Sequence, residues 1–146
     1  MNYKCDIGFG PHLTLDLSSC NKKILNDKEK IYNLLDKLPA LIGMTKIFQP
    51  NVTHYPGKEG SFDKGGVSAF VLIAESHITI HTFVEQGYAF VDIFSCKPFE
   101  LDFAEDFFVK NLEAKKVEKR VFDRGVEFPK TVAVVKNIVK RERKGF

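Results

Sequence analysis

The chain has 146 residues, which is enough for one domain with a buried core and too few for two domains of ordinary size. Its 44% hydrophobic and 28% charged residues exclude disordered and fibrous proteins, and 14 Phe without any Trp predict a core rich in phenylalanine. The net charge of +3 comes largely from a C-terminal basic cluster, and no base-reading motif accompanies it, so no nucleic-acid partner is predicted; the cluster consists of Lys136, Lys140, Arg141, Arg143 and Lys144.

The cysteines and the apolar runs indicate the compartment. Cys5, Cys20 and Cys96 form an odd set without paired spacing, which argues against a disulfide framework and favours a reducing environment. The N-terminus has no signal-peptide core, and no apolar run reaches the roughly 18 to 20 residues that a membrane span needs. We therefore expect a cytoplasmic protein with no membrane partner.

A strand and a helix are expected first in the chain. Apolar and polar residues alternate over 12–17, which predicts a strand with three leucines toward the core, Leu13, Leu15 and Leu17. Residues 27–44 carry apolar side chains at helical spacing, with Asn26 as the expected N-cap; this apolar face consists of Ile31, Leu34, Leu35, Leu38, Leu41 and Ile42. Pro39 is expected to kink the helix or end its regular part, and Gly43 to terminate it.

The middle of the chain is rich in strand signals. Residues 46–55 indicate an edge strand interrupted at Pro50, and residues 56–66 form the one long loop, which contains four glycines. The nearly continuous apolar run over 67–74 is typical of a central strand, broken only by Ser68.

Residues 77–83 and 88–95 predict a β-hairpin, since a four-residue connection ending in Gly87 separates them. If Phe83 pairs with Tyr88 across this connection, then Ser76 pairs with Ser95. Cys96 then lies beside the bond between residues 75 and 76.

His81 does not fit that ladder in the same way. It lies five residues after Ser76, so the two side chains have opposite parity along an ideal strand. A break or sharp bend at residue 76 would remove this conflict.

The C-terminal part of the chain predicts a second helix, a further strand and one ambiguous segment. Residues 102–114 show helical spacing with Asp102 as the expected cap, and the apolar positions are Phe103, Phe107, Phe108 and Leu112. Residues 116–122 alternate as a strand would, with a turn at Gly125 and Pro129. Residues 131–143 fit either a helix or a strand.

Together these elements predict an α+β fold with one domain over residues 1–146. It is a two-layer sandwich, with a mainly antiparallel sheet and two helices on one face. The strands are rich in Val, Ile and Phe, so the other face of the sheet is expected to pack against a second copy as a homodimer.

Several chemistries suit the reactive residues around position 76. His77, His81 and Cys96 are metal-ligand types, but they are split between strand faces and form no evident tetrahedral set, so no metal is predicted. A serine hydrolase would use Ser76 as nucleophile, a histidine as base and Asp92 as orienter, yet the G-x-S-x-G elbow is missing. Each residue taken singly also fits a structural role.

The segment over residues 65–96 closely resembles the self-processing segment of the prokaryotic S-adenosylmethionine decarboxylase family. The likeness rests on Glu-Ser-His at 75–77, on a histidine five residues after the serine and on a cysteine twenty residues after it. It extends over most of residues 8–122, including an N-terminal run that looks like the start of that family, with Gly10, His12, Leu13, Asp16 and Cys20.

This resemblance implies that the chain cleaves itself between Glu75 and Ser76 into fragments 1–75 and 76–146. The Ser76 hydroxyl would attack the carbonyl of Glu75, and elimination from the resulting ester would leave a covalently bound pyruvoyl group at residue 76 as the only cofactor. His81 would help to remove the proton that permits elimination, with support from Ser68. The pyruvoyl carbonyl would form a Schiff base with the substrate amine, and Cys96 would return a proton to carbon.

The resemblance also implies a substrate, S-adenosylmethionine, and a product used in polyamine (spermidine) synthesis. Phe62 matches an aromatic residue that stacks on adenine, and Glu85 matches an acid that binds the ribose hydroxyls. Relatives with the same motif decarboxylate arginine or ornithine, and for such substrates Asp63 or Glu85 would bind the distal cation. A third alternative is a binding or regulatory homologue that never processes.

Overall fold

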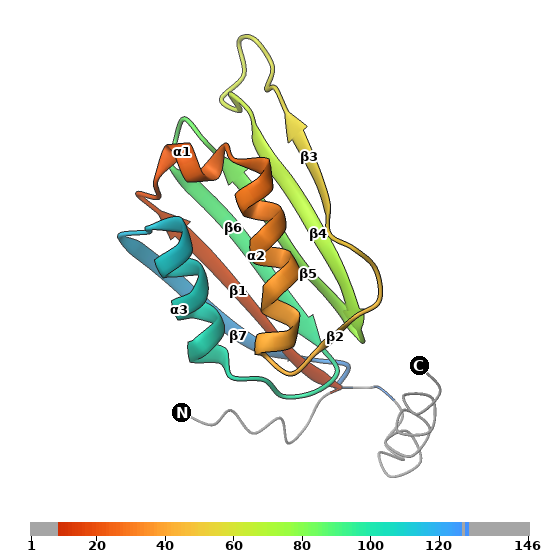
Figure 1. Cartoon of the computed structure of the whole chain (residues 1–146). Helices are drawn as coiled ribbons and strands as arrows, with labels where there is room; N and C mark the ends of the chain where they lie inside the picture. The colour runs from red at the N-terminus through yellow and green to blue at the C-terminus, as the bar shows by residue number, and fades with distance from the viewer. Residues whose placement is uncertain (1–8, 127, 129–146) are drawn as a thin grey trace.

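Seven strands form one antiparallel sheet, and three helices cover one of its faces (Figure 1). The computed structural model describes residues 9–126 and 128. The elements in chain order are β1 (Gly10–Ser18), α1 (Lys22–Leu25), α2 (Lys28–Leu41), β2 (Thr45–Lys46), β3 (Asn51–Tyr55), β4 (Gly66–Ala74), β5 (Ser76–Phe83), β6 (Tyr88–Ser95), α3 (Leu101–Leu112) and β7 (Lys116–Arg124). The predicted two-layer α+β fold is confirmed, with three helices in the described residues where two were expected.

The strand order is β2-β4-β5-β6-β1-β7, and β3 pairs with the same side of β4 as β2 does. The interrupted strand predicted over 46–55 is therefore two short edge strands, separated at Pro50. The β5–β6 hairpin has the predicted register, in which Ser76 pairs with Ser95 and Phe83 with Tyr88. This register fixes the position of every functional side chain on the two strands.

The core between sheet and helices consists mainly of Leu, Ile and Val, and the predicted Phe-rich core is wrong. Among the described residues, Phe108 is the single phenylalanine that is buried. The reason is the two-residue period of a strand. The phenylalanines of the strands occupy the parity opposite to the buried leucines, isoleucines and valines, which places them on the sheet face that no helix covers; they are Phe70, Phe83, Phe90, Phe94 and Phe122.

We call this uncovered side of the sheet the open face. It exposes six large apolar side chains by 36% to 47% each, Tyr55, Phe70, Leu72, Tyr88, Phe90 and Phe122. Large exposed apolar side chains gathered on one face of a sheet are typical of an interface.

The first long helix begins one residue later than predicted. Asp27 is the N-cap of α2, and its side chain accepts a hydrogen bond from the Lys30 N–H. Asn26 instead ends α1, a short helix that the sequence patterns did not predict. Pro39 lies near the C-terminal end of α2, and Leu41, predicted to face the sheet, is 55% exposed.

The cap expected for α3 is also wrong, because Glu100 occupies the N-cap position without a side-chain hydrogen bond. Asp102 lies in the first turn, and its carboxylate accepts a hydrogen bond from Lys119 of β7 at 2.5 Å. The apolar face of α3 is buried at Phe108 and Leu112, whereas Phe103 is 45% exposed. Residues 131–143 lie outside the described residues.

Candidate active site

The connection between β4 and β5 consists of Glu75 alone. Ser76, the first residue of β5, has a φ of 113°, a backbone conformation that non-glycine residues rarely adopt. Holding a non-glycine residue in such a backbone conformation reduces the stability of the folded state by on the order of 1–3 kcal/mol. The sharp bend predicted at residue 76 is therefore present, and the strain lies in the Ser76 backbone, next to the bond between residues 75 and 76.

The Ser76 side chain lies beside that of its neighbour. Its Oγ is 3.4 Å from Nδ1 of His77, a long hydrogen bond of the kind often found at unliganded catalytic sites. Across the ladder Ser76 pairs with Ser95, so Cys96 is the next residue beyond the pair. Cys96 is half-buried and forms no disulfide. The hairpin thus brings a hydroxyl and a thiol to the same end of the sheet.

Two further side chains extend this cluster on the open face. His12 of β1 lies 2.9 Å from Asp92 of β6, measured from Nε2 to Oδ1. The His12 ring also meets the His77 ring edge-on, with centroids 6.4 Å apart. Sequence patterns gave no signal for this pairing, because β1 and β6 are joined only in the folded sheet.

A second cluster lies near the other end of β5. Nδ1 of His81 is 3.0 Å from Oγ of Ser68, and the two residues are direct partners in the β4–β5 ladder. His81 is five residues from Ser76 along a strand that rises about 3.3 Å per residue, so the separation is about 16 Å. The fold does not bring these two predicted processing residues to Ser76 within one chain.

The residues predicted to bind substrate lie at the same end as His81. Phe62 is 80% exposed in the loop between β3 and β4, and its carbonyl accepts a hydrogen bond from Gln86 at 2.7 Å. The Asp63 carboxylate stabilises the same loop by accepting a hydrogen bond from the Gly65 N–H at 2.9 Å. Glu85 is exposed on the β5–β6 turn, next to Gln86. This loop and this turn therefore form one surface.

We call the end with Ser76 and Cys96 the cleavage end, and the end with Ser68, His81 and Phe62 the binding end. The cleavage end fits the pyruvoyl group implied by the motif, since it supplies a serine at a strained turn and a thiol across the ladder. Each end holds only part of the predicted machinery.

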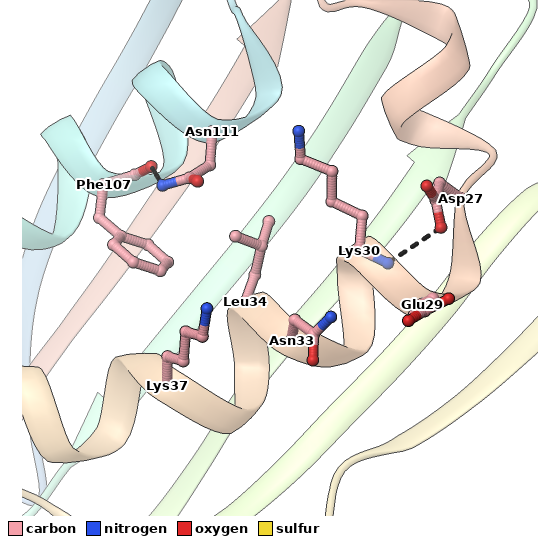
Figure 2. A pocket seen from close by; sticks show the side chains of 8 residues that line it. All are labelled: Asp27, Glu29, Lys30, Asn33, Leu34, Lys37, Phe107 and Asn111. Carbon is pink, nitrogen blue, oxygen red and sulfur yellow. Dashed lines mark hydrogen bonds between the residues drawn. The ribbon is translucent and has the colours of Figure 1, made fainter.

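A cavity of about 330 Å³ lies elsewhere, between α2 and α3 on the helical side of the sheet (Figure 2). It is lined by Asp27, Glu29, Lys30, Asn33, Leu34, Lys37, Phe107 and Asn111. None of these is a predicted site residue, and both ends of the candidate site lie outside this cavity.

Residues 9–126 and 128 contain no group of three or more His, Cys, Asp or Glu placed to hold a metal ion. No helix in this part of the chain is long and apolar enough to cross a bilayer.

Comparison with known proteins gives a consistent result. A model of the S-adenosylmethionine decarboxylase family matches residues 11–125. The S-adenosylmethionine decarboxylase proenzyme of Thermodesulfovibrio yellowstonii is 36% identical over 107 residues, which are 73% of each chain. The arginine decarboxylase proenzyme of Caldivirga maquilingensis is 34% identical over 119 residues, covering 79% of this chain and 83% of that protein.

A solved structure shares the fold. The crystal structure of the adenosylmethionine decarboxylase from Aquifex aeolicus superposes with a TM-score of 0.65 at 32% sequence identity, covering 81% of this chain and 92% of that one.

Proposed function

The chain belongs to the S-adenosylmethionine decarboxylase family, and on that premise we propose that it is a proenzyme that cleaves itself between Glu75 and Ser76 and then decarboxylates S-adenosylmethionine. The observation that carries this proposal is the strained one-residue turn at the Glu75–Ser76 bond, with the Ser76 hydroxyl hydrogen-bonded and Cys96 across the ladder. The product would serve polyamine synthesis in the cytoplasm.

Cleavage uses atoms of the chain itself. Oγ of Ser76 attacks the carbonyl carbon of Glu75, the C–N bond breaks, and the nitrogen of residue 76 takes up the proton, which converts a peptide into an ester. Elimination then releases the Glu75 carboxylate, and hydrolysis with loss of ammonia leaves a pyruvoyl group at residue 76. Backbone strain at Ser76 favours this reaction, because residue 76 becomes a chain terminus and its φ is no longer constrained.

When formed, the pyruvoyl group supplies an electron-accepting carbonyl for loss of carbon dioxide. We assign to Cys96 the proton that is returned to carbon, and its position next to Ser95, the ladder partner of Ser76, supports this role. Cys20 is unsuitable for this role, because it is buried beside Gly87 of the β5–β6 turn, at the end of the sheet opposite Ser76.

A complete site requires two copies of the chain. Ser68 and His81 lie about 16 Å from Ser76 along β5, too far to act on it directly. Both clusters are on or beside the open face, whose exposed phenylalanines favour packing against another sheet. In a dimer whose two-fold axis lies in this interface and runs across the strands, the binding end of one copy meets the cleavage end of the other.

The binding end suits a nucleoside. Phe62 presents an exposed aromatic ring for stacking on adenine, and Glu85 presents a carboxylate for the ribose hydroxyls. The hydrogen bond from Gln86 to the Phe62 carbonyl ties their two segments together, so both groups would approach one ligand.

A basic amino acid is the second candidate substrate. The Caldivirga relative is an arginine decarboxylase proenzyme, and Asp63 adds a second carboxylate beside Phe62 that would pair with a distal cation.

Two measurements test the function. Intact mass should show fragments 1–75 and 76–146 from the wild-type chain and a whole chain from Ser76→Ala. Carbon dioxide release should then be assayed with S-adenosylmethionine, arginine and ornithine in parallel. A wild-type chain that remains whole would show a non-processing homologue, and release from an amino acid alone would replace the proposed substrate.

A further inference from the structure

The Ser76 hydroxyl is the first member of a chain of polar groups that crosses three strands. Its neighbour His77 is at 3.4 Å, the His77 ring faces the His12 ring edge-on, and His12 is hydrogen-bonded to Asp92. The phenyl ring of Phe94 lies against both histidines, with centroids 5.6 Å from His12 and 6.1 Å from His77. This arrangement places two imidazoles and a carboxylate in line behind the hydroxyl that must lose a proton.

The hydrogen bonds define which nitrogens carry protons. An ionised carboxylate only accepts, so Nε2 of His12 donates to Asp92 and Nδ1 of a neutral His12 is an acceptor. That Nδ1 is buried, and no partner for it lies among the described residues. An unpaired buried acceptor costs free energy, so a donor is expected nearby. The facing edge of His77 is the donor that this geometry offers, directly after a small ring movement or through one water.

If Nε2 of His77 carries the proton toward His12, then Nδ1 of His77 holds a lone pair toward Ser76. This tautomer is the one that accepts a proton from a hydroxyl. The 3.4 Å contact is then a hydrogen bond donated by Oγ of Ser76 to Nδ1 of His77.

The surroundings keep His77 neutral. Burial lowers its pKa and Arg124 of β7 lowers it as well, while Asp92 opposes this. The β4 and β6 partners of His77 in the ladder are the uncharged Leu72 and Phe94. Glu75, Cys96, Lys97 and Asp123 are further titratable groups at this end of the sheet. A neutral imidazole near pH 7 is the form that serves as a base.

We propose that His77 is the base that takes the proton of the Ser76 hydroxyl in self-cleavage, and that His12 and Asp92 are positioning residues that fix its tautomer. The proton moves from Oγ of Ser76 to Nδ1 of His77 as the new C–O bond forms. His77 then returns it to the nitrogen of residue 76 as the C–N bond breaks, so no proton is gained or lost. This inference rests on the proposed function.

The role differs from that of His81 by the step it serves. His77 acts before the ester exists, whereas His81, supplied by a second copy, acts on the ester during elimination. Blocking His81 therefore accumulates an ester that hydroxylamine cleaves, and blocking His77 prevents that ester from forming.

The first experiment compares His77→Ala with His81→Ala as full-length chains made by cell-free synthesis. We expect His77→Ala to stay whole with and without hydroxylamine, with ester formation slowed by roughly 10²–10⁴-fold. His81→Ala should break at residue 75 when hydroxylamine is added. The matched control is His54→Ala, which removes an exposed histidine on β3 and should cleave like the wild type.

Chemical rescue separates a base from a structural residue. Free imidazole should restore cleavage of purified His77→Ala, at a rate that follows the neutral fraction of imidazole as pH is varied. His77→Asn keeps an acceptor atom but no basic nitrogen, so it should remain slow. Lack of rescue together with a native circular dichroism spectrum would overturn the role of His77 as base.

A double-mutant cycle tests the two positioning residues. Asp92→Asn and His12→Asn should each slow the wild-type chain but leave the imidazole-rescued His77→Ala chain unaffected, because they act only through His77. If either substitution slows cleavage equally in the wild-type chain and in the rescued His77→Ala chain, His12 and Asp92 do not act through His77. If the wild-type chain never cleaves, the proposed function fails; if it cleaves and His77→Ala cleaves equally fast, only this inference fails.

Discussion

The hydroxyl of Ser68 lies 3.0 Å from Nδ1 of His81, and the pair is separated from Ser76 by most of the length of β5. A site shared between two copies predicts complementation. Coexpression of Ser76→Ala with His81→Ala should allow about half of the His81→Ala chains to cleave, because a mixed dimer joins an intact Ser76 to an intact His81 and random pairing makes such dimers about half of the total. Different affinity tags let mass spectrometry follow each chain.

The control for complementation is His81→Ala expressed alone, which should lose elimination by roughly 10²–10⁴-fold. A His81→Ala chain that remains whole in the mixture would place the entire site within one chain.

The apolar open face predicts the route of dimer formation. Phe70→Glu should shift the protein toward monomers and slow self-cleavage, since a charge buried between two sheets loses its solvation. Phe103→Glu is the matched control, because Phe103 on α3 is similarly exposed, at 45% against 42% for Phe70, but lies on the helical side. Light scattering after gel filtration measures the mass. If Phe70→Glu and Phe103→Glu have the same mass in solution and the same rate of self-cleavage, the open face is not the dimer interface.

The hairpin and its register could be predicted from sequence because two local signals agree. The four-residue connection sets which residues pair, and the alternation of apolar side chains sets which face is buried. Ser76 was therefore placed correctly against Ser95. The bend at Ser76 is present, but the parity argument for it was wrong, because His81 does not reach Ser76 within one chain.

The rest depended on information that is not local. The composition gives the number of phenylalanines but not the face of the strand on which each one lies. The core was therefore predicted to be rich in phenylalanine, although the phenylalanines of the strands lie on the open face. Asn26 and Asp27 are equivalent N-cap candidates, and only the short helix α1 decides between them. The contact between His12 and Asp92 joins residues 80 positions apart, which no spacing rule could place.

The two described cysteines should differ in reactivity. Iodoacetamide at pH 8 should modify Cys96 and abolish carbon dioxide release from the cleaved enzyme, while Cys20 stays protected because burial holds its thiol protonated with a pKa of about 11. Peptide mapping by mass spectrometry identifies the modified residue. Cys96→Ala should still cleave itself but lose roughly 10²–10⁴-fold in decarboxylation. Retained decarboxylation in that variant would assign the proton donor elsewhere.

The Cys20 thiol also makes the free energy of unfolding depend on pH. The pKa of Cys20 is higher in the folded protein than its ordinary value of 9.0, so the folded state binds this proton more tightly. Its contribution is complete below about pH 9 and is lost as pH rises toward about 11. In urea titrations, Cys20→Ala should therefore lose less stability than the parent chain between these pH values. Parallel losses in both chains would show that other groups control alkaline unfolding.

Thr82 joins three elements through one buried hydroxyl. Its Oγ1 accepts a hydrogen bond from the Val67 N–H at 2.8 Å and donates to the Leu25 carbonyl at 2.9 Å. Thr82→Val keeps the shape but leaves both backbone groups unpaired, which should lower the free energy of unfolding by about 1–3 kcal/mol for each. Urea unfolding of the uncleaved Ser76→Ala chain measures this change. Thr79→Val, on the open face of the same strand, is the control and should change stability by less than about 0.5 kcal/mol; an equal loss there would reject the hydroxyl bridge as the cause.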